Sequence, residues 1–217
     1  ILGIAGLVGA GRTEAVQCLF GVWPGRWEGT IYIDGQPVKI DNCQQAIAHG
    51  IAMVPEDRKK DGILADLSVR ENMIIALQAK KGMFHPMSRK EMEEAADKYI
   101  DLLQIKTASR ETPIKSLSGG NQQKIIIARE VSSNPDLLIA VQPTRGLDVG
   151  AEEFVHQALY DQRNSGKAVL LISFELDEIL AVSDRIMVLH KGKIAGIVDA
   201  NHTTREEIGA MMLGLTE

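Results

Sequence analysis

The stretch Leu117–Asp148, LSGGNQQKIIIAREVSSNPDLLIAVQPTRGLD, decides the fold of this chain. It begins with a Ser-Gly-Gly turn, continues as an apolar-striped helix over residues 119–131, and becomes a hydrophobic run over residues 136–141 that suits a central parallel strand. Two glycines at a helix start let backbone N–H groups approach a phosphate, Ser118 adds a hydroxyl donor, and the helix dipole favours an anion. The alternative is a plain Ser-Gly turn that caps a helix.

A second glycine-rich turn lies near the start of the chain. Residues 1–5 form an apolar run that predicts a buried strand, and GLVGAGRT follows before a helix that runs to about Phe20. The spacing fits the phosphate-binding pattern G-x-x-x-x-G-K-[ST] except that Arg12 replaces the lysine. Thr13 can offer its hydroxyl to Mg²⁺, whereas a planar guanidinium cannot reproduce a compact ammonium between phosphates. We therefore predict an altered nucleotide-binding loop, with a ligand-free turn as the alternative; its residues are Gly6, Gly9, Ala10, Gly11, Arg12 and Thr13.

Composition limits the possible functions. The 217 residues are 45% apolar and 24% charged, which is ordinary for one or two globular domains. A net charge of −5 gives no electrostatic footprint for nucleic acid, so we expect no nucleic-acid partner. The two cysteines and the scattered histidines show neither a disulfide framework nor metal-ligand spacing. Because the chain starts inside an apolar segment, we expect it to be part of a longer polypeptide.

The region between the two glycine-rich turns changes from strands to helices. Alternating residues around Asp34-Gly35 predict a hairpin over residues 29–40, and residues 51–54 predict a strand that ends shortly before Glu56. Two capping boxes, Ser68 with Glu71 and Ser88 with Glu91, then mark helix starts. Residues 62–118 are therefore predicted to be mainly helical.

Taken in order, these motifs resemble those of ATP-binding cassette (ABC) ATPases over essentially the whole chain. The resemblance implies an α/β P-loop NTPase domain with a mixed central sheet flanked by helices. It places the domain at residues 1–217, with a core at about 1–61 and 119–217 and a helical subdomain at about 62–118. It also implies that the family's first strands, and the aromatic residue that stacks on adenine, precede Ile1.

In the ABC family two domains associate head to tail, and each ATP lies between the phosphate loop of one and the signature of the other. The resemblance thus implies a signature that contacts the ATP held by a partner domain. Its residues are Leu117, Ser118, Gly119, Gly120, Asn121 and Gln122. It also implies that the loop with Gly146, Leu147 and Asp148 reaches across to the partner domain. The alternative is that this loop is a simple turn. Glu56 stands where the family commonly has a glutamine that couples the metal to the transporter; a solvated charged loop is the alternative.

Four positions depart from the ABC pattern. Val141 and Gln142 replace the Asp that helps hold Mg²⁺ and the Glu that orients water, while Phe174 replaces the switch histidine and Arg12 the lysine. A neutral amide is a poor proton acceptor, and losing a general base costs about 10²–10⁴ in rate. We therefore expect no intact catalytic residue at this domain's own site, with ATP and Mg²⁺ held weakly there.

The spellings GLVGAGRTE, LSGGNQQK and PTRGLDVGA resemble the second nucleotide-binding domain of fused importer ATPases. VPEDR resembles the sugar- and nucleoside-importer branch, and IAVQPTRGLD resembles the nucleoside importers more than the ribose or xylose ones. The implied partners are a first ABC domain on the same polypeptide, transmembrane permease subunits and, indirectly, a substrate-binding protein. The implied location is the cytoplasmic face of the cell membrane. The alternatives are a nucleotide-independent assembly or regulatory module and a cytosolic ABC protein unrelated to transport.

Overall fold

A six-stranded sheet forms the centre of the computed structural model, which describes residues 1–82 and 84–215. Residue 83 of the predicted helical subdomain and residues 216–217 of the predicted domain lie outside the described residues. In spatial order the strands are β4 (Ile51–Val54), β5 (Leu137–Val141), β6 (Ala168–Ile172), β1 (Leu2–Gly6), β7 (Arg185–His190) and β8 (Lys193–Asp199).

The first five strands in this order are parallel, and β8 pairs antiparallel with β7, so the predicted mixed sheet is confirmed. The reversal uses a two-residue turn in which Lys191 and Gly192 both have positive φ, 47° and 75°. Because parallel strands end at the same edge, the residues after β1, β4, β5 and β6 meet there. The phosphate loop, Glu56, Gln142 and Phe174 therefore share one edge of the sheet.

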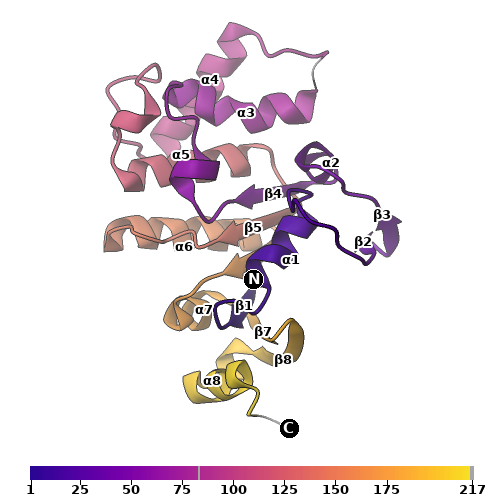
Figure 1. Ribbon diagram of the computed structural model, residues 1–217. Helices are drawn as coiled ribbons and strands as arrows, with labels where there is room; N and C mark the ends of the chain where they lie inside the picture. Colours follow the sequence, from indigo (N-terminus) through magenta and orange to yellow (C-terminus); the bar gives the residue numbers. More distant parts are fainter. Residues whose placement is uncertain (83, 216–217) are drawn as a thin grey trace.

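Helices cover both faces of the sheet, which is why its strands are apolar on both sides (Figure 1). Along β5, Leu138 and Ala140 pack into one hydrophobic cluster, while Ile139 and Val141 pack into the other. The first cluster includes residues of α6 (Val149–Asn164), α7 (Leu176–Val182) and α8 (Arg205–Leu213). The second includes residues of α1 (Arg12–Leu19) and α2 (Cys43–Ala48).

The segment between β4 and β5 is helical, and most of it lies beyond the β4 end of the sheet (Figure 1). Both predicted capping boxes are present, with Ser68 and Ser88 as N-caps, and a third hydrophobic cluster joins the helices around Val69, Ile114 and Ile125. The π-helical turn at the start of the segment was not predicted. The elements of the segment between β4 and β5 are η1 (Arg58–Gly62), α3 (Val69–Lys81), α4 (Arg89–Leu102), η2 (Ile114–Ser116) and α5 (Gly119–Ser132).

Two smaller features complete the fold. The predicted hairpin forms a separate two-stranded sheet of β2 (Ile31–Ile33) and β3 (Gln36–Val38), and a one-turn η3 (Ala200–His202) precedes α8. Within the described part of the chain, no helix is long and apolar enough to span a bilayer.

Candidate functional site

The phosphate loop joins β1 to α1 at the carboxyl edge of the sheet. Gly9 and Gly11 have φ values of 81° and 93°, a left-handed conformation in which side chains are strained. A Cβ on Gly9 would meet no atom within 4 Å, so the backbone conformation rather than crowding calls for glycine there. The Ala10 N–H donates to the Leu7 carbonyl at 3.0 Å, and the Gly192 N–H donates to the Ala10 carbonyl at 3.2 Å. The loop is thus held in shape by its own backbone hydrogen bonds.

Arg12, the first residue of α1, turns its side chain into the protein. It is 4% exposed, and its Nη1 donates to the carbonyl of Ser173 at 3.0 Å. Its guanidinium carbon lies 4.7 Å from the centre of the Phe174 ring, a cation–π contact. Burial lowers the pKa of Arg12, although Glu56 and Glu14 oppose that shift. Two of the four altered positions are therefore in contact with each other, which the sequence did not predict.

The other two altered positions lie at the end of β5. Val141 is 2% exposed and packs in the cluster that includes residues of α1 and α2. Gln142 is 6% exposed with a φ of 51°, and its backbone N–H donates to the Ile172 carbonyl at 2.8 Å. Among the described residues its Nε2 is buried and has no hydrogen-bond partner. Neither side chain offers a carboxylate to a metal ion or to water.

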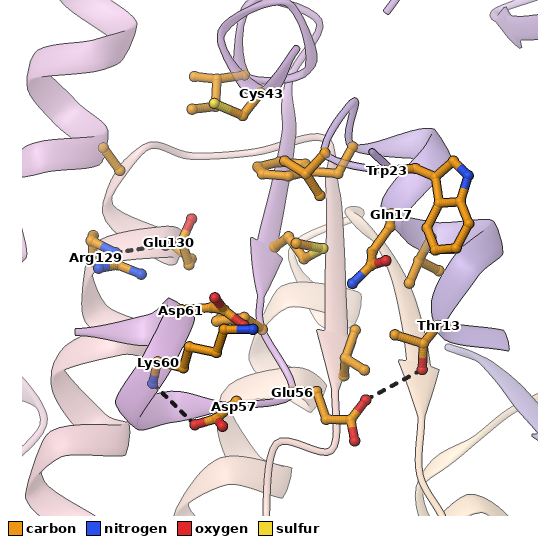
Figure 2. A pocket seen from close by; sticks show the side chains of 18 of the residues that line it. Thr13, Gln17, Trp23, Cys43, Glu56, Asp57, Lys60, Asp61, Arg129 and Glu130 are labelled. Carbon is orange, nitrogen blue, oxygen red and sulfur yellow. Dashed lines mark hydrogen bonds and ion pairs between the residues drawn. The ribbon is translucent and has the colours of Figure 1, made fainter. Parts of the chain in front are cut away.

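Glu56 connects the phosphate loop to the loop after β5. The Thr13 hydroxyl donates to Glu56 Oε2 at 3.3 Å (Figure 2), and Arg145 Nη1 donates to Glu56 Oε1 at 3.4 Å. Thr13 and Glu56 are therefore the oxygen ligands that fit Mg²⁺ at this site. No cluster of three His, Cys, Asp or Glu side chains suited to a metal occurs in residues 1–82 and 84–215. The metal fit is thus partial.

The signature forms the start of α5, with Ser118 as its N-cap. Ser118 Oγ accepts hydrogen bonds from the backbone N–H and from Nδ2 of Asn121, at 3.4 and 2.9 Å, so its own O–H remains available as a donor. Asn121 Oδ1 accepts from the Lys106 N–H at 2.8 Å, and Gln122 Nε2 donates to the Leu117 carbonyl at 3.1 Å. These bonds orient the turn while leaving the exposed serine hydroxyl free.

The loop after β5 ends by capping α6. Asp148 Oδ1 accepts from the Ala151 N–H at 2.9 Å, and Gly146 takes a φ of 68°. The Leu147 N–H donates to the Thr144 carbonyl at 3.1 Å. Asp148 therefore has a concrete structural role as an N-cap, whether or not it also meets a partner domain.

Sequence reasoning missed two polar pairs, one buried and one partly buried. Arg129 Nε donates to Glu130 Oε1 at 2.7 Å, and Arg129 Nη1 donates to the Gly62 carbonyl at 2.8 Å. Burial raises the pKa of Glu130 despite Arg129 beside it. The second pair is His156 with Glu178, at 2.8 Å; burial would raise the pKa of Glu178, but hydrogen bonds led by the one from His156 lower it overall. Only the Arg129-Glu130 dipeptide was visible in the sequence.

A groove of about 910 Å³ opens beside the phosphate loop (Figure 2). One wall comes from α1, from α2 with Cys43, and from the segment between them with Trp23. The other wall comes from η1, α3 and α5. Thr13 and Glu56 both line it, so it communicates with the phosphate-loop site. No described hydrogen bond or ion pair joins the phosphate loop to the signature.

Comparison with known proteins identifies relatives of this chain. The chain is 50% identical over 209 residues to the xylose import ATP-binding protein XylG of Escherichia coli K12, and 49% identical to that of Shigella flexneri. The alignments cover 96% of this chain and 41% of each relative, so the chain spans less than half the length of these proteins. The sequence pattern of the ABC transporter family matches residues 1–145.

Solved structures show the same fold. The ATP-binding cassette MJ0796 bound to ADP and Pi has a TM-score of 0.76 at 24% identity, with 92% of this chain and 85% of that chain covered. The ADP conformation of MJ1267 has a TM-score of 0.75 at 20% identity, with 98% and 84% covered. With the family match over two thirds of the sequence, these findings show that the chain belongs to the ABC transporter family.

Proposed function

We propose that this chain is the second ATP-binding domain of an importer ATPase and that its two glycine-rich turns do different work. Its signature, from Leu117 to Gln122, would complete the active ATP site of the first domain on the same polypeptide. Its own phosphate loop would hold a nucleotide that is not turned over. The 50% identity to xylose import proteins favours a simple sugar as the cargo, and a nucleoside is the second candidate.

The observation that carries this proposal is the contrast between Ser118 and Arg12. Ser118 is exposed, and its O–H is available for a phosphate oxygen. Arg12 is buried, donates to the Ser173 carbonyl and stacks on Phe174, so the cation that replaces the lysine is engaged by the protein itself. Charge at the transferring phosphoryl group accounts for most of the rate of phosphoryl transfer, so its loss disables this site.

At its own site the chain would contribute binding rather than chemistry. The amides of Gly9 and Gly11 would hold phosphates, and Thr13 with Glu56 would hold Mg²⁺, whose charge would neutralise the phosphate oxygens. Gln142 can donate or accept a hydrogen bond but cannot take a proton from water at neutral pH. A bound nucleotide would then contact both domains and stabilise their association.

The test uses the full-length protein with the catalytic glutamate of the first domain removed. We expect two ATP per polypeptide to remain bound and unhydrolysed, one at each site, and the one at this domain's phosphate loop to be lost when Thr13→Ala and Gly11→Val are added. Quantifying ATP and ADP after rapid gel filtration gives the answer. Steady hydrolysis that depends on Thr13 would contradict the proposal, because it would require a replacement for the missing carboxylates.

We further propose that the 910 Å³ groove receives a segment of the permease, which would place the chain at the cytoplasmic membrane face. Glu56 lines the groove and hydrogen-bonds Thr13, so insertion there would be felt at the phosphate loop. Cys43 is exposed and lines the groove, which provides a native thiol for cross-linking. A cross-link from Cys43 to the permease, absent in Cys43→Ser, is the expected result; labelling of Cys43 unaffected by the permease would contradict it.

A further inference from the structure

A buried carboxylate that the proposed function does not use lies between α6 and α7. Glu178, on α7, is 8% exposed, and its Oε1 is 2.8 Å from Nε2 of His156 on α6. The sequence neighbours of this pair, Val155 and Ile179, are buried and apolar. A carboxylate in such surroundings lowers stability unless several donors match it, so this pair is an energetically unfavourable way to join two helices.

Two hydroxyl groups from the carboxyl edge of the sheet also face Glu178. Ser173 directly follows β6, Thr144 lies in the loop after β5, and both are buried. Burial is the largest influence and would raise the pKa of Glu178, but the His156 ring and the two hydroxyls lower it overall. Neither hydroxyl meets Oε2 with the geometry of a hydrogen bond, and this oxygen is without a partner in the described part of the chain. A small shift of either segment would complete such a bond.

Ser173 connects Glu178 to the phosphate-loop side of the molecule. Its Oγ accepts from the Glu175 N–H at 3.0 Å, which leaves its own O–H available as a donor toward Glu178. Its carbonyl accepts from Arg12 Nη1, and the next residue, Phe174, stacks on the same arginine. The position of Ser173 therefore sets where the contact between Arg12 and Phe174 lies.

Thr144 connects the same carboxylate to the loop that is proposed to reach the partner domain. Its carbonyl accepts from the Leu147 N–H at 3.1 Å, and the next residue, Asp148, caps α6. His156 lies about two turns further along α6. Glu178 thus contacts α6 through His156 and the loop that precedes α6 through Thr144. One carboxylate therefore joins α7 and the end of β6 to this loop and its helix.

We propose that Glu178, oriented by His156, is a positioning residue that holds the loop after β5 in place against the end of β6. It acts through Thr144 and Ser173 and not by contact with a nucleotide. The proposal rests on the proposed function, because the loop is expected to act at the ATP site completed together with the first domain. A misplaced loop should impair turnover at that site more than ATP binding, since orientation matters most in the transition state.

The test measures kcat and KM for ATP hydrolysis by the full-length protein. Glu178→Gln keeps the size of the side chain but replaces one acceptor oxygen with a donor; it should lower kcat about 10-fold and change KM less than about two-fold. His156→Ala should lower kcat to a similar extent, and His156→Gln, which retains a donor, should recover most of that loss. Because the two residues act as a unit, the double variant Glu178→Gln with His156→Ala should lose little more than either single variant.

Tyr160→Phe is the matched control. Tyr160 lies one turn after His156 on α6, and its hydroxyl donates to the Ala181 carbonyl of α7 at 3.0 Å, so it joins the same two helices farther from the start of α6. We expect kcat and KM to be unchanged in this variant. An equal loss of kcat in Tyr160→Phe and Glu178→Gln would overturn the proposal, because helix packing alone would then explain the effect. An unchanged kcat in Glu178→Gln would also overturn it.

Thr144→Val covers the case in which Glu178→Gln does not fold, because it removes one hydroxyl and nearly conserves volume. It should lower kcat a few-fold, and an unchanged kcat in this variant would then overturn the proposal. A failure of the proposed function would appear elsewhere, as ATP lost or hydrolysed at this domain's phosphate loop in the protein without these substitutions. The two ideas can therefore fail separately.

Discussion

The phosphate loop and the signature are both glycine-containing turns that begin a helix, yet the interior behind each is built differently. Behind the signature helix, Arg129 is paired with a buried carboxylate, Glu130, and bonds the Gly62 carbonyl. Behind the phosphate loop, Arg12 contacts a carbonyl and an aromatic ring, and no salt bridge joins it to a carboxylate within the described residues. The serine hydroxyl of one turn is exposed, whereas the cation of the other is buried in contacts with the protein.

This contrast teaches that side chains that depart from the family pattern can still be well integrated into the structure. Phe174 is 45% exposed, and Arg12 stacks against it, so the two substituted side chains contact each other. An arginine at this position without that ring would have only the Ser173 carbonyl to satisfy it. Arg12 and Phe174 thus depart from the family pattern as a pair in contact.

The largest effect should come from the buried arginines themselves. Arg129→Ala leaves Glu130 buried without its partner and should destabilise the domain by about 3–5 kcal/mol. Arg12→Ala should cost less, about 1–3 kcal/mol, because it leaves only a carbonyl unpaired. Urea unfolding followed by circular dichroism compares the two variants. Equal losses in the free energy of unfolding would contradict the difference inferred between the surroundings of the two arginines.

Next in size is the effect on ATP turnover. Ser118→Arg in the full-length protein blocks the signature and should lower steady-state hydrolysis about 10²–10³-fold, the range for removing one donor at a developing charge. Thr13→Ala should lower hydrolysis far less, because its site is proposed to support the pairing of the domains without turning over its own nucleotide. A colorimetric phosphate assay measures both. A larger loss with Thr13→Ala would reverse the roles assigned to the two turns.

Restoring the four altered positions should abolish the contrast. The combined change Arg12→Lys, Val141→Asp, Gln142→Glu and Phe174→His reintroduces the metal-holding, water-orienting and switch groups. With the first domain's catalytic glutamate removed, we expect hydrolysis to rise about 10²-fold over the unrestored protein. Gln142→Glu alone serves as the control and should give little, because Arg12 would remain turned toward Phe174.

The smallest effect concerns the loop that connects the two regions. Asp148→Ala removes the N-cap of α6 and should cost about 1 kcal/mol in stability. Thr204→Ala removes a comparable cap from α8, at a site distant from the nucleotide, and is the matched control. If Asp148 also reaches the partner domain, only Asp148→Ala will lower ATP turnover. Identical turnover in both variants would leave Asp148 with its capping role alone.

Much of the architecture followed from local patterns. Apolar runs located the strands of the sheet, Ser-x-x-Glu pairs located the starts of α3 and α4, and Asp34-Gly35 located the hairpin turn. The order of the glycine-rich turns indicated the fold family, which the comparisons confirmed. These features depend on residues within a few positions of one another, so sequence spacing encodes them.

What only the tertiary structure decided are the contacts between segments far apart in sequence. Arg12 meets Phe174, Thr13 meets Glu56, and Arg129 meets the Gly62 carbonyl because parallel strands end at one edge and α5 packs against η1. The sequence by itself determined that Val141 and Gln142, at the end of β5, offer no carboxylate. It could not show where the replacements point, since a side chain's direction depends on the neighbours that folding brings to it.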